Sequence, residues 1–197
     1  GSSLYSEDMF PAARSASNVI GTSAVGNYNA ATLETKLTGI PASASPFIFQ
    51  LYEGINGSSS VKDKETMMQL IYSYLVKFRE DTVALSAYIS RERSTLANLL
   101  ANPNVWFSDR VNRVTSSNHP RRRIPTIESY DKIKMTDIMK IYRDRFGDLN
   151  DLDFFFVGNF NPDTLKLLTS RYLGALPGAG RKETWKDIGD RYPKGRV

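Results

Sequence analysis

The stretch that most constrains the fold is 151–177, DLDFFFVGNFNPDTLKLLTSRYLGALP. Leu152 to Val157 is a short apolar and aromatic run closed by a glycine, which predicts a strand covered on at least one face. Asn161 then supplies an N-cap oxygen, and Pro162 takes the first helical position, where its missing N–H is no loss. Leucines at helical spacing follow, up to a second glycine. We expect one strand, one tight turn and one amphipathic helix.

A strand that runs through glycine into a helix N-terminus can bind an anion, because unpaired N–H groups and the helix dipole converge there. The turn VGNFNPD, however, has neither a GxGxxG pattern nor a P-loop lysine. We therefore interpret Gly158 as the residue that lets the chain turn sharply into the helix.

The rest of the chain predicts two adjacent strands within residues 42–60, joined near Tyr52 to Gly54, and a series of helices. Asp8 and Asn29 are the expected N-caps of the first two helices. The helices are expected near residues 8–20, 29–39, 60–78, 81–100, 105–114, 126–133 and 138–146. Few strands among blocks of helices indicate an α+β domain with one mostly antiparallel sheet and helices packed mainly on one face.

The composition of the chain excludes or disfavours several kinds of functional site. The 197 residues, 41% of them hydrophobic, suffice for one globular domain with a real core. The absence of cysteine excludes disulfides, thiolate metal sites and a cysteine nucleophile. A single histidine disfavours a self-contained catalytic zinc site, which normally uses several. No apolar run approaches the roughly 20 residues that cross a bilayer, so we expect no membrane span.

The segment NHPRRR holds the most conspicuous candidate residues. His119 as a general base would need an orienting carboxylate and a substrate group, and the sequence shows neither, so a structural role is favoured. Arg121, Arg122 and Arg123 could contact phosphate, but one triplet without interleaved aromatic residues is a weak signal. The net charge of +5 permits nucleic-acid contact without demanding it, and a solvated or domain-facing loop is the favoured interpretation.

Three segments together resemble a known family. They are SPFIFQLYEGINGSSSVKDKETMMQLIY, NHPRRRIPTIESYDKI and IYRDRFGDLNDLDFFFVGNFNPDTLKLLTSRYLGALP. In this order they are similar to the repeating domain of the pitrilysin/insulinase zinc peptidases, the inverzincins, and most similar to a bacterial zinc-protease branch. The resemblance spans roughly residues 5–177, and the tail GRKETWKDIGDRYPKG resembles the interdomain segment of that branch.

The resemblance implies several similar pitrilysin-like α+β domains in two halves that close around a peptide. The family's zinc lies in the first domain, on a helix with H-x-x-E-H, where two histidines bind the metal and the glutamate activates water. Here Ser15, Asn18 and Val19 fall approximately at those positions, and none can replace them. The chain thus resembles a non-catalytic, substrate-enclosing domain of a larger zinc metallopeptidase, inactive when isolated. We expect no catalytic, cofactor-binding or metal-binding residue here, and zinc elsewhere in the parent chain.

We expect residues 1–177 to form one domain whose first strands precede residue 1, and residues 178–197 to be an interdomain linker or crossing strand. The expected partners are other domains of the parent chain and a peptide substrate, without nucleic acid. Phe47, Phe49 and Leu51 are the candidate binding residues, on a strand edge that could pair with a peptide or be buried by another domain. The resemblance alone places the parent in the bacterial cell envelope or periplasm.

Two other functions stay open. The parent could lack an active site and act as a binding or assembly subunit, as some family members do. Alternatively, the chain could be a basic nucleic-acid-binding module that uses Arg121 to Arg123.

Overall fold

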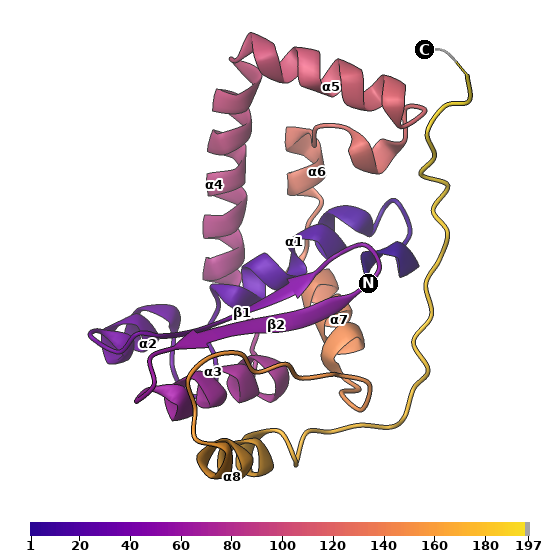
Figure 1. Cartoon of the computed structure of the whole chain (residues 1–197). Helices are drawn as coiled ribbons and strands as arrows, with labels where there is room; N and C mark the ends of the chain where they lie inside the picture. Colours follow the sequence, from indigo (N-terminus) through magenta and orange to yellow (C-terminus); the bar gives the residue numbers. More distant parts are fainter. Residues whose placement is uncertain (196–197) are drawn as a thin grey trace.

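A computed structural model describes residues 1–195 of the chain (Figure 1). No helix in this part combines the length and apolar character needed to cross a membrane. The elements in chain order are η1 (Ser2–Leu4), α1 (Phe10–Gly21), α2 (Ala30–Leu37), β1 (Ala42–Ile48), β2 (Glu53–Ser59), α3 (Lys64–Val76), α4 (Thr82–Leu100), α5 (Pro103–Thr115), η2 (Pro120–Arg122), α6 (Ile127–Asp131), α7 (Met135–Phe146) and α8 (Pro162–Tyr172).

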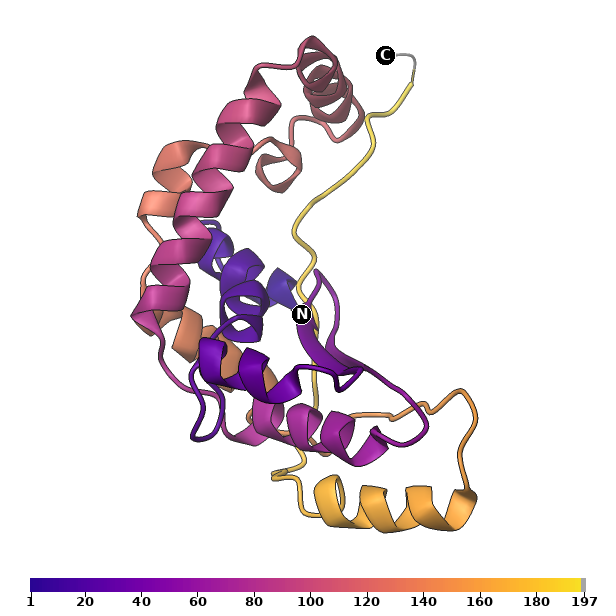
Figure 2. The same cartoon turned by 90° about the vertical axis from the view of Figure 1, so that its left-hand side faces the viewer.

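The strands β1 and β2 form an antiparallel hairpin. Ala42 lies opposite Ser59, and Ile48 lies opposite Glu53. The hairpin is one layer, and α1, α3 and α7 lie together behind it, as the side view shows (Figure 2). This confirms the α+β class, with an antiparallel sheet and helices mainly on one face.

The core fills the space between α1, α3, α7 and the hairpin. Tyr142 of α7 lies at its centre, with its ring centroid 4.6 Å from those of Phe78 and Phe146. Its hydroxyl donates to the carbonyl of Tyr74 at 3.1 Å, which satisfies the buried polar group. Burial raises the pKa of this hydroxyl well above its ordinary value. The residues around it with at most 1% exposure are Ala13, Ala16, Val19, Ile20, Met68, Leu75, Ile138 and Ile141.

Side-chain caps set several helix starts. The Asn29 amide oxygen accepts from the N–H of Thr32 at 2.8 Å, and Asn161 accepts from Asp163 and Thr164 at 2.9 and 3.0 Å. These two predicted caps are confirmed.

The predicted cap at Asp8 is wrong. Helix α1 begins at Phe10, and Met9 is its N-cap without a side-chain hydrogen bond. Two turns precede it, in which the N–H groups of Met9 and Phe10 donate to Ser6 and Glu7 carbonyls at 3.1 and 3.3 Å. Pro11, in the first turn, has no N–H to satisfy, so fewer donors need a cap.

The predicted strand at residues 152–157 is not a strand. The segment is extended, and its burial alternates as a strand's would: Leu152, Phe154 and Phe156 are half-buried against the core. Phe155 and Val157 are 87% and 98% exposed. Its backbone makes one main-chain hydrogen bond within residues 1–195, from the N–H of Leu152 to the carbonyl of Leu149 at 3.4 Å, and pairs with no strand there. The alternation predicted from the sequence is therefore present, but the segment has no neighbouring strand to pair with in the described part of the chain.

The ends of the fold are bridged by a long extended segment. Helices α4 and α5 form an arm on one side, and residues 178–195 run along the other side from near α8 up to α5 (Figure 1). No strand is assigned to residues 178–195. Their role as an interdomain linker or a strand that crosses to a neighbouring domain stays a prediction. Residues 196 and 197 of the predicted linker lie outside the described residues.

Replacing Ile138 tests the core. Ile138 is 0% exposed on α7, so Ile138→Ala should lower the free energy of unfolding by about 2–5 kcal/mol through lost burial and a residual cavity. Urea unfolding followed by circular dichroism measures it. Val83→Ala, at a position 77% exposed on α4, is the control and should change stability by less than about 0.5 kcal/mol. Equal effects of the two substitutions would contradict this packing.

Candidate functional site

The helix α1 carries the positions that the resemblance aligns with a metal-binding motif. The Ser15 hydroxyl is buried and accepts a hydrogen bond from the Tyr88 hydroxyl at 3.1 Å. Val19 is fully buried in the core, and Asn18 is exposed. Within residues 1–195, no three His, Asp or Glu side chains come together as a metal site. The donor set of α1 therefore does not fit a zinc ion.

His119 has a structural place. It is the N-cap of η2, and its Nδ1 accepts from the N–H of Arg121 at 3.3 Å. Its Nε2 lies 2.9 Å from the carbonyl oxygen of Ile188, to which it donates, because Nδ1 is the acceptor. Both ring nitrogens are thus used to hold a turn and the C-terminal segment.

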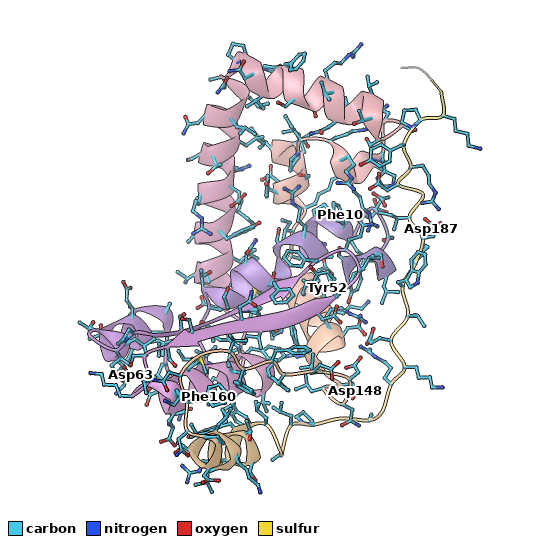
Figure 3. The ribbon with its side chains drawn as sticks, in the orientation of Figure 1. Phe10, Tyr52, Asp63, Asp148, Phe160 and Asp187 are labelled. Carbon is cyan, nitrogen blue, oxygen red and sulfur yellow. The ribbon has the colours of Figure 1, made fainter. Side chains whose placement is uncertain are left out.

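Arg121 fastens the N-terminal segment. Its guanidinium donates to Glu7 at 2.8 Å and to the carbonyls of Ser2 and Tyr5 at 3.1 and 2.6 Å. It lies over the Phe10 ring at 4.4 Å, and Figure 3 shows Phe10 beside this loop. The side chain is only 4% exposed, so its charge is already satisfied within the fold.

The neighbouring arginines make weaker attachments. Arg122 donates to Asp190 of the C-terminal segment at 2.7 Å and remains 58% exposed. Arg123 donates to the carbonyl of Asn118 at 2.8 Å from Nη2. The segment NHPRRR therefore binds the N-terminal segment through Arg121 and the C-terminal segment through His119 and Arg122. Its polar composition alone did not indicate these contacts.

A buried arginine joins three further elements. Arg145 of α7, 3% exposed in its side chain, donates to Asp144 and Glu183 at 2.8 Å each, and to Glu53 of β2 at 3.3 Å. Its Nε donates to the Tyr5 hydroxyl at 3.1 Å. We call these five residues the Arg145 network.

The pKa values in the Arg145 network reflect this pairing. Burial raises the pKa of Asp144, but hydrogen bonds from Tyr5 and Arg145 outweigh it and hold the pKa below its ordinary value. The same balance, with bonds from Arg145 and Arg181, lowers the pKa of Glu183. Burial first, and then the Asp144 carboxylate, raise the pKa of Tyr5. The carboxylates are thus held ionised to support structure.

A cleft of about 270 Å³ lies between α1 and the loop that leads into α6. Phe10, Pro11, Ile124, Pro125 and Tyr130 give it apolar walls. Ser15 lines it too, so the cleft borders the helix face where the resemblance places the first motif residue.

One of the arginines that line this cleft has no partner in the described part of the chain. The exposed Arg14 side chain makes no hydrogen bond or ion pair with residues 1–195, whereas Arg121 and Arg123, which also line the cleft, are bonded. Arg14 and Tyr130 are 116 positions apart in sequence, so no local pattern could have indicated that they line one cleft.

The predicted binding residues lie around the turn of the hairpin. Phe47 is in β1, but Phe49 and Leu51 lie in the turn, so only the first is on a strand. The Phe47, Phe49 and Tyr52 rings pack at centroid distances of 5.0–6.0 Å. Phe49, Leu51 and Tyr52 are 52%, 57% and 60% exposed, and Figure 3 shows Tyr52 at the front of the sheet. We call Phe47, Phe49, Leu51 and Tyr52 the aromatic patch. It is an exposed apolar surface, and its role in binding stays a prediction.

No protein-family model and no curated protein sequence matches the chain. Several solved structures do. The periplasmic protease PqqL from Escherichia coli has a TM-score of 0.76 at 17% identity, over 95% of this chain and 21% of that one. The ferredoxin protease FusC, solved as a mutant in complex with Arabidopsis ferredoxin, gives 0.69 at 14% identity, over 89% and 19%. A protease from Helicobacter pylori gives 0.71 at 13% identity, over 98% and 47%.

These comparisons show the fold. Nearly the whole chain superposes on part of each protease, and the chain spans about a fifth of the first two and about half of the third. The arrangement of elements described above is therefore one that occurs within larger proteases.

The Arg145 network predicts a pH dependence of stability. The folded-state pKa values of Asp144 and Glu183 lie below the ordinary 3.8 and 4.5, so their stabilisation is present above about pH 4.5 and is lost as pH falls through the lowered values. Glu183→Gln should reduce the loss of unfolding free energy between pH 6 and pH 3. Urea titrations at several pH values measure this. Glu34→Gln, at an exposed position on α2, is the control. A pH profile of Glu183→Gln that parallels the unsubstituted chain would contradict the role of the network.

Proposed function

We propose that this chain is a non-catalytic domain of a larger zinc metallopeptidase. The observation that carries the proposal is the residue set of α1: at the positions that the sequence resemblance aligns with a metal-binding motif stand Ser15, Asn18 and Val19, which do not form a zinc ligand set. The superposition on segments of three proteases supports the parent's class.

The finer assignment rests on the sequence resemblance. It places the parent in the pitrilysin/insulinase group and its zinc in another domain. The periplasmic location of one structurally similar protease supports an envelope location for the parent. Other domains of the same polypeptide and a peptide substrate are the proposed partners.

The proposed role of this domain is to enclose the substrate. The cleft beside α1 has apolar walls for side chains and the unpaired guanidinium of Arg14 for a carboxylate or a peptide carbonyl. This arrangement supports peptide contact better than nucleic-acid contact, because the side chain of Arg121, the first arginine of the basic loop, is buried and hydrogen-bonded within the fold. The aromatic patch is the surface on which we expect another domain of the parent to pack.

The proposal predicts where peptidase activity resides. The purified 197-residue chain should not cleave a quenched peptide library in the presence of zinc, whereas the parent should cleave it in a chelator-sensitive way. Zinc-dependent cleavage by the chain that persists through a second purification would contradict the proposal. An inactive parent without H-x-x-E-H in its other domains would instead establish the binding or assembly subunit.

Arg14 tests the enclosing role within the parent. Arg14→Glu should raise KM about tenfold with little change in kcat, because a charge contact to bound peptide is lost without touching the reacting atoms. Arg110→Glu, on the exposed surface of α5, makes the same charge change and should leave both constants unaltered. Equal KM values for the two variants would exclude the cleft as a substrate contact.

A further inference from the structure

A cavity between α2 and α3 is larger than the cleft beside α1 and shares no lining residue with it. Its volume is about 450 Å³, within the range of about 300–1,000 Å³ that is typical of ligand pockets. It lies toward the end of the hairpin that is farthest from the N-terminus, where α2 and α3 come together (Figure 1). Apolar side chains that line it are Leu33, Leu37, Ile40 and Leu70. We call it the α2–α3 cavity.

Helix α2 is packed more loosely than α3. None of its residues is buried, whereas five residues of α3 are. Leu33 and Leu37 of α2 are only half-buried. Because protein interiors are normally close-packed, apolar atoms placed in the cavity would cover both leucines and supply contacts that the described part of the chain does not make. The α2–α3 cavity therefore has room and apolar surface for a ligand.

Two lysines give this cavity a positive charge. Lys36 and Lys77 line it, and neither ammonium group forms an ion pair or a hydrogen bond with residues 1–195. Among the described residues, no Asp or Glu lines the cavity. The two ammonium groups lie over the rings of Tyr28 and Tyr72, at 5.0 and 5.6 Å from the ring centroids. Such contacts are weak at exposed positions, so both charges can pair with an anion.

The order of residues on α2 favours an anion that is attached directly to an apolar group. Leu33, Lys36 and Leu37 stand at positions i, i+3 and i+4, so one face of the helix presents an ammonium group beside two leucines. The last residue of a peptide matches this face, because its carboxylate and its side chain are attached to the same carbon atom. That carboxylate is ionised at neutral pH and accepts strong hydrogen bonds from ammonium groups.

Uncharged polar groups of the same cavity favour a peptide over a plain aliphatic acid. The side chains of Asn27, Thr66, Gln69 and Ser73 also line it. Their amides and hydroxyls donate and accept hydrogen bonds, and a peptide backbone offers partners of both kinds. A hydrocarbon chain would displace water from these groups without replacing its hydrogen bonds, which is unfavourable.

We propose that the α2–α3 cavity binds the C-terminal end of a peptide whose last residues are apolar. The free carboxylate pairs with Lys36 and Lys77, and an apolar side chain packs against Leu33 and Leu37. The bound peptide then holds α2 against α3. This site lies wholly within the chain and does not depend on the proposed peptidase parent, so its failure would leave that proposal untouched.

Isothermal titration calorimetry of the 197-residue chain tests the role of the carboxylate. N-acetylleucylalanine should bind at least about tenfold more tightly than its C-terminal amide, because only the acid carries a negative charge. K36Q/K77Q should abolish this difference. K132Q/K140Q removes the same charge from two exposed positions outside the cavity and should preserve the difference.

NMR spectra of the backbone amides locate the bound peptide. N-acetylleucylalanine should shift the resonances of residues 25–40 and of α3, and it should slow hydrogen exchange in α2, because that helix becomes better packed. Resonances of residues 120–130, at the cleft beside α1, should not shift. Ser73→Trp places a large side chain in the cavity, and it should prevent binding of both the acid and the amide while the circular dichroism stays unchanged.

Four results would overturn the proposal: no binding of the acid by either method, equal affinities for the acid and the amide, a difference that survives K36Q/K77Q, or shifts confined to the cleft beside α1. Decanoate is the comparison ligand, since it has a carboxylate and an apolar body but no peptide groups. Tighter binding of decanoate than of N-acetylleucylalanine would also overturn the proposal and would identify an aliphatic acid as the ligand.

Discussion

The fold depends on the satisfaction of one buried positive charge. Arg145 extends from α7 and buries its guanidinium between β2 and the two terminal segments, where an unpaired charge would be very costly. Its partners come from β2, from α7 itself, from the N-terminal segment through Tyr5 and from the C-terminal segment through Glu183. An ion pair of this kind adds little net stability over apolar packing, but loss of any partner is expensive. Its effect is therefore to fix where two otherwise irregular segments lie.

Other polar side chains also hold the C-terminal segment in place, from Arg145 to the loop before α6. The C-terminal segment is held at Arg145, then through the N–H of Lys186 on Ser3, then at His119 and Arg122. Every one of these residues has a chemistry that could serve catalysis or ligand binding, yet each is occupied by the chain's own backbone or carboxylates. The polar residues that most resemble functional groups thus hold the ends of the chain, whereas Arg14, at the cleft beside α1, has no hydrogen-bond or ion-pair partner within residues 1–195.

Local physics made much of the fold predictable from sequence. Asparagine caps at positions 29 and 161, the hairpin and the amphipathic helices follow from hydrogen bonding and periodicity within a few residues. Residues 152–157 are not a strand in the structure, although the sequence predicts one. Alternating side chains indicate an extended segment, but a strand also needs a neighbouring strand for its hydrogen bonds, and the sequence pattern does not show whether one is present. The clasp formed by Arg121 and the cleft lined by Arg14 and Tyr130 join residues more than a hundred positions apart, so only the tertiary structure brings them together. The sequence was informative at Ser15, Asn18 and Val19, because whether an H-x-x-E-H zinc site can form at the aligned positions depends on residue type alone.

The central proposal is that this chain, which has the fold of part of larger proteases, forms no zinc site of its own. A competition titration of the purified 197-residue chain with zinc and a chromophoric chelator addresses it most directly. We predict that the chain does not compete for zinc and that its thermal unfolding is unaltered by the metal. Retention of one equivalent of zinc with a Kd below about 1 µM, together with a raised Tm, would contradict the claim, because such affinity requires a formed set of protein ligands.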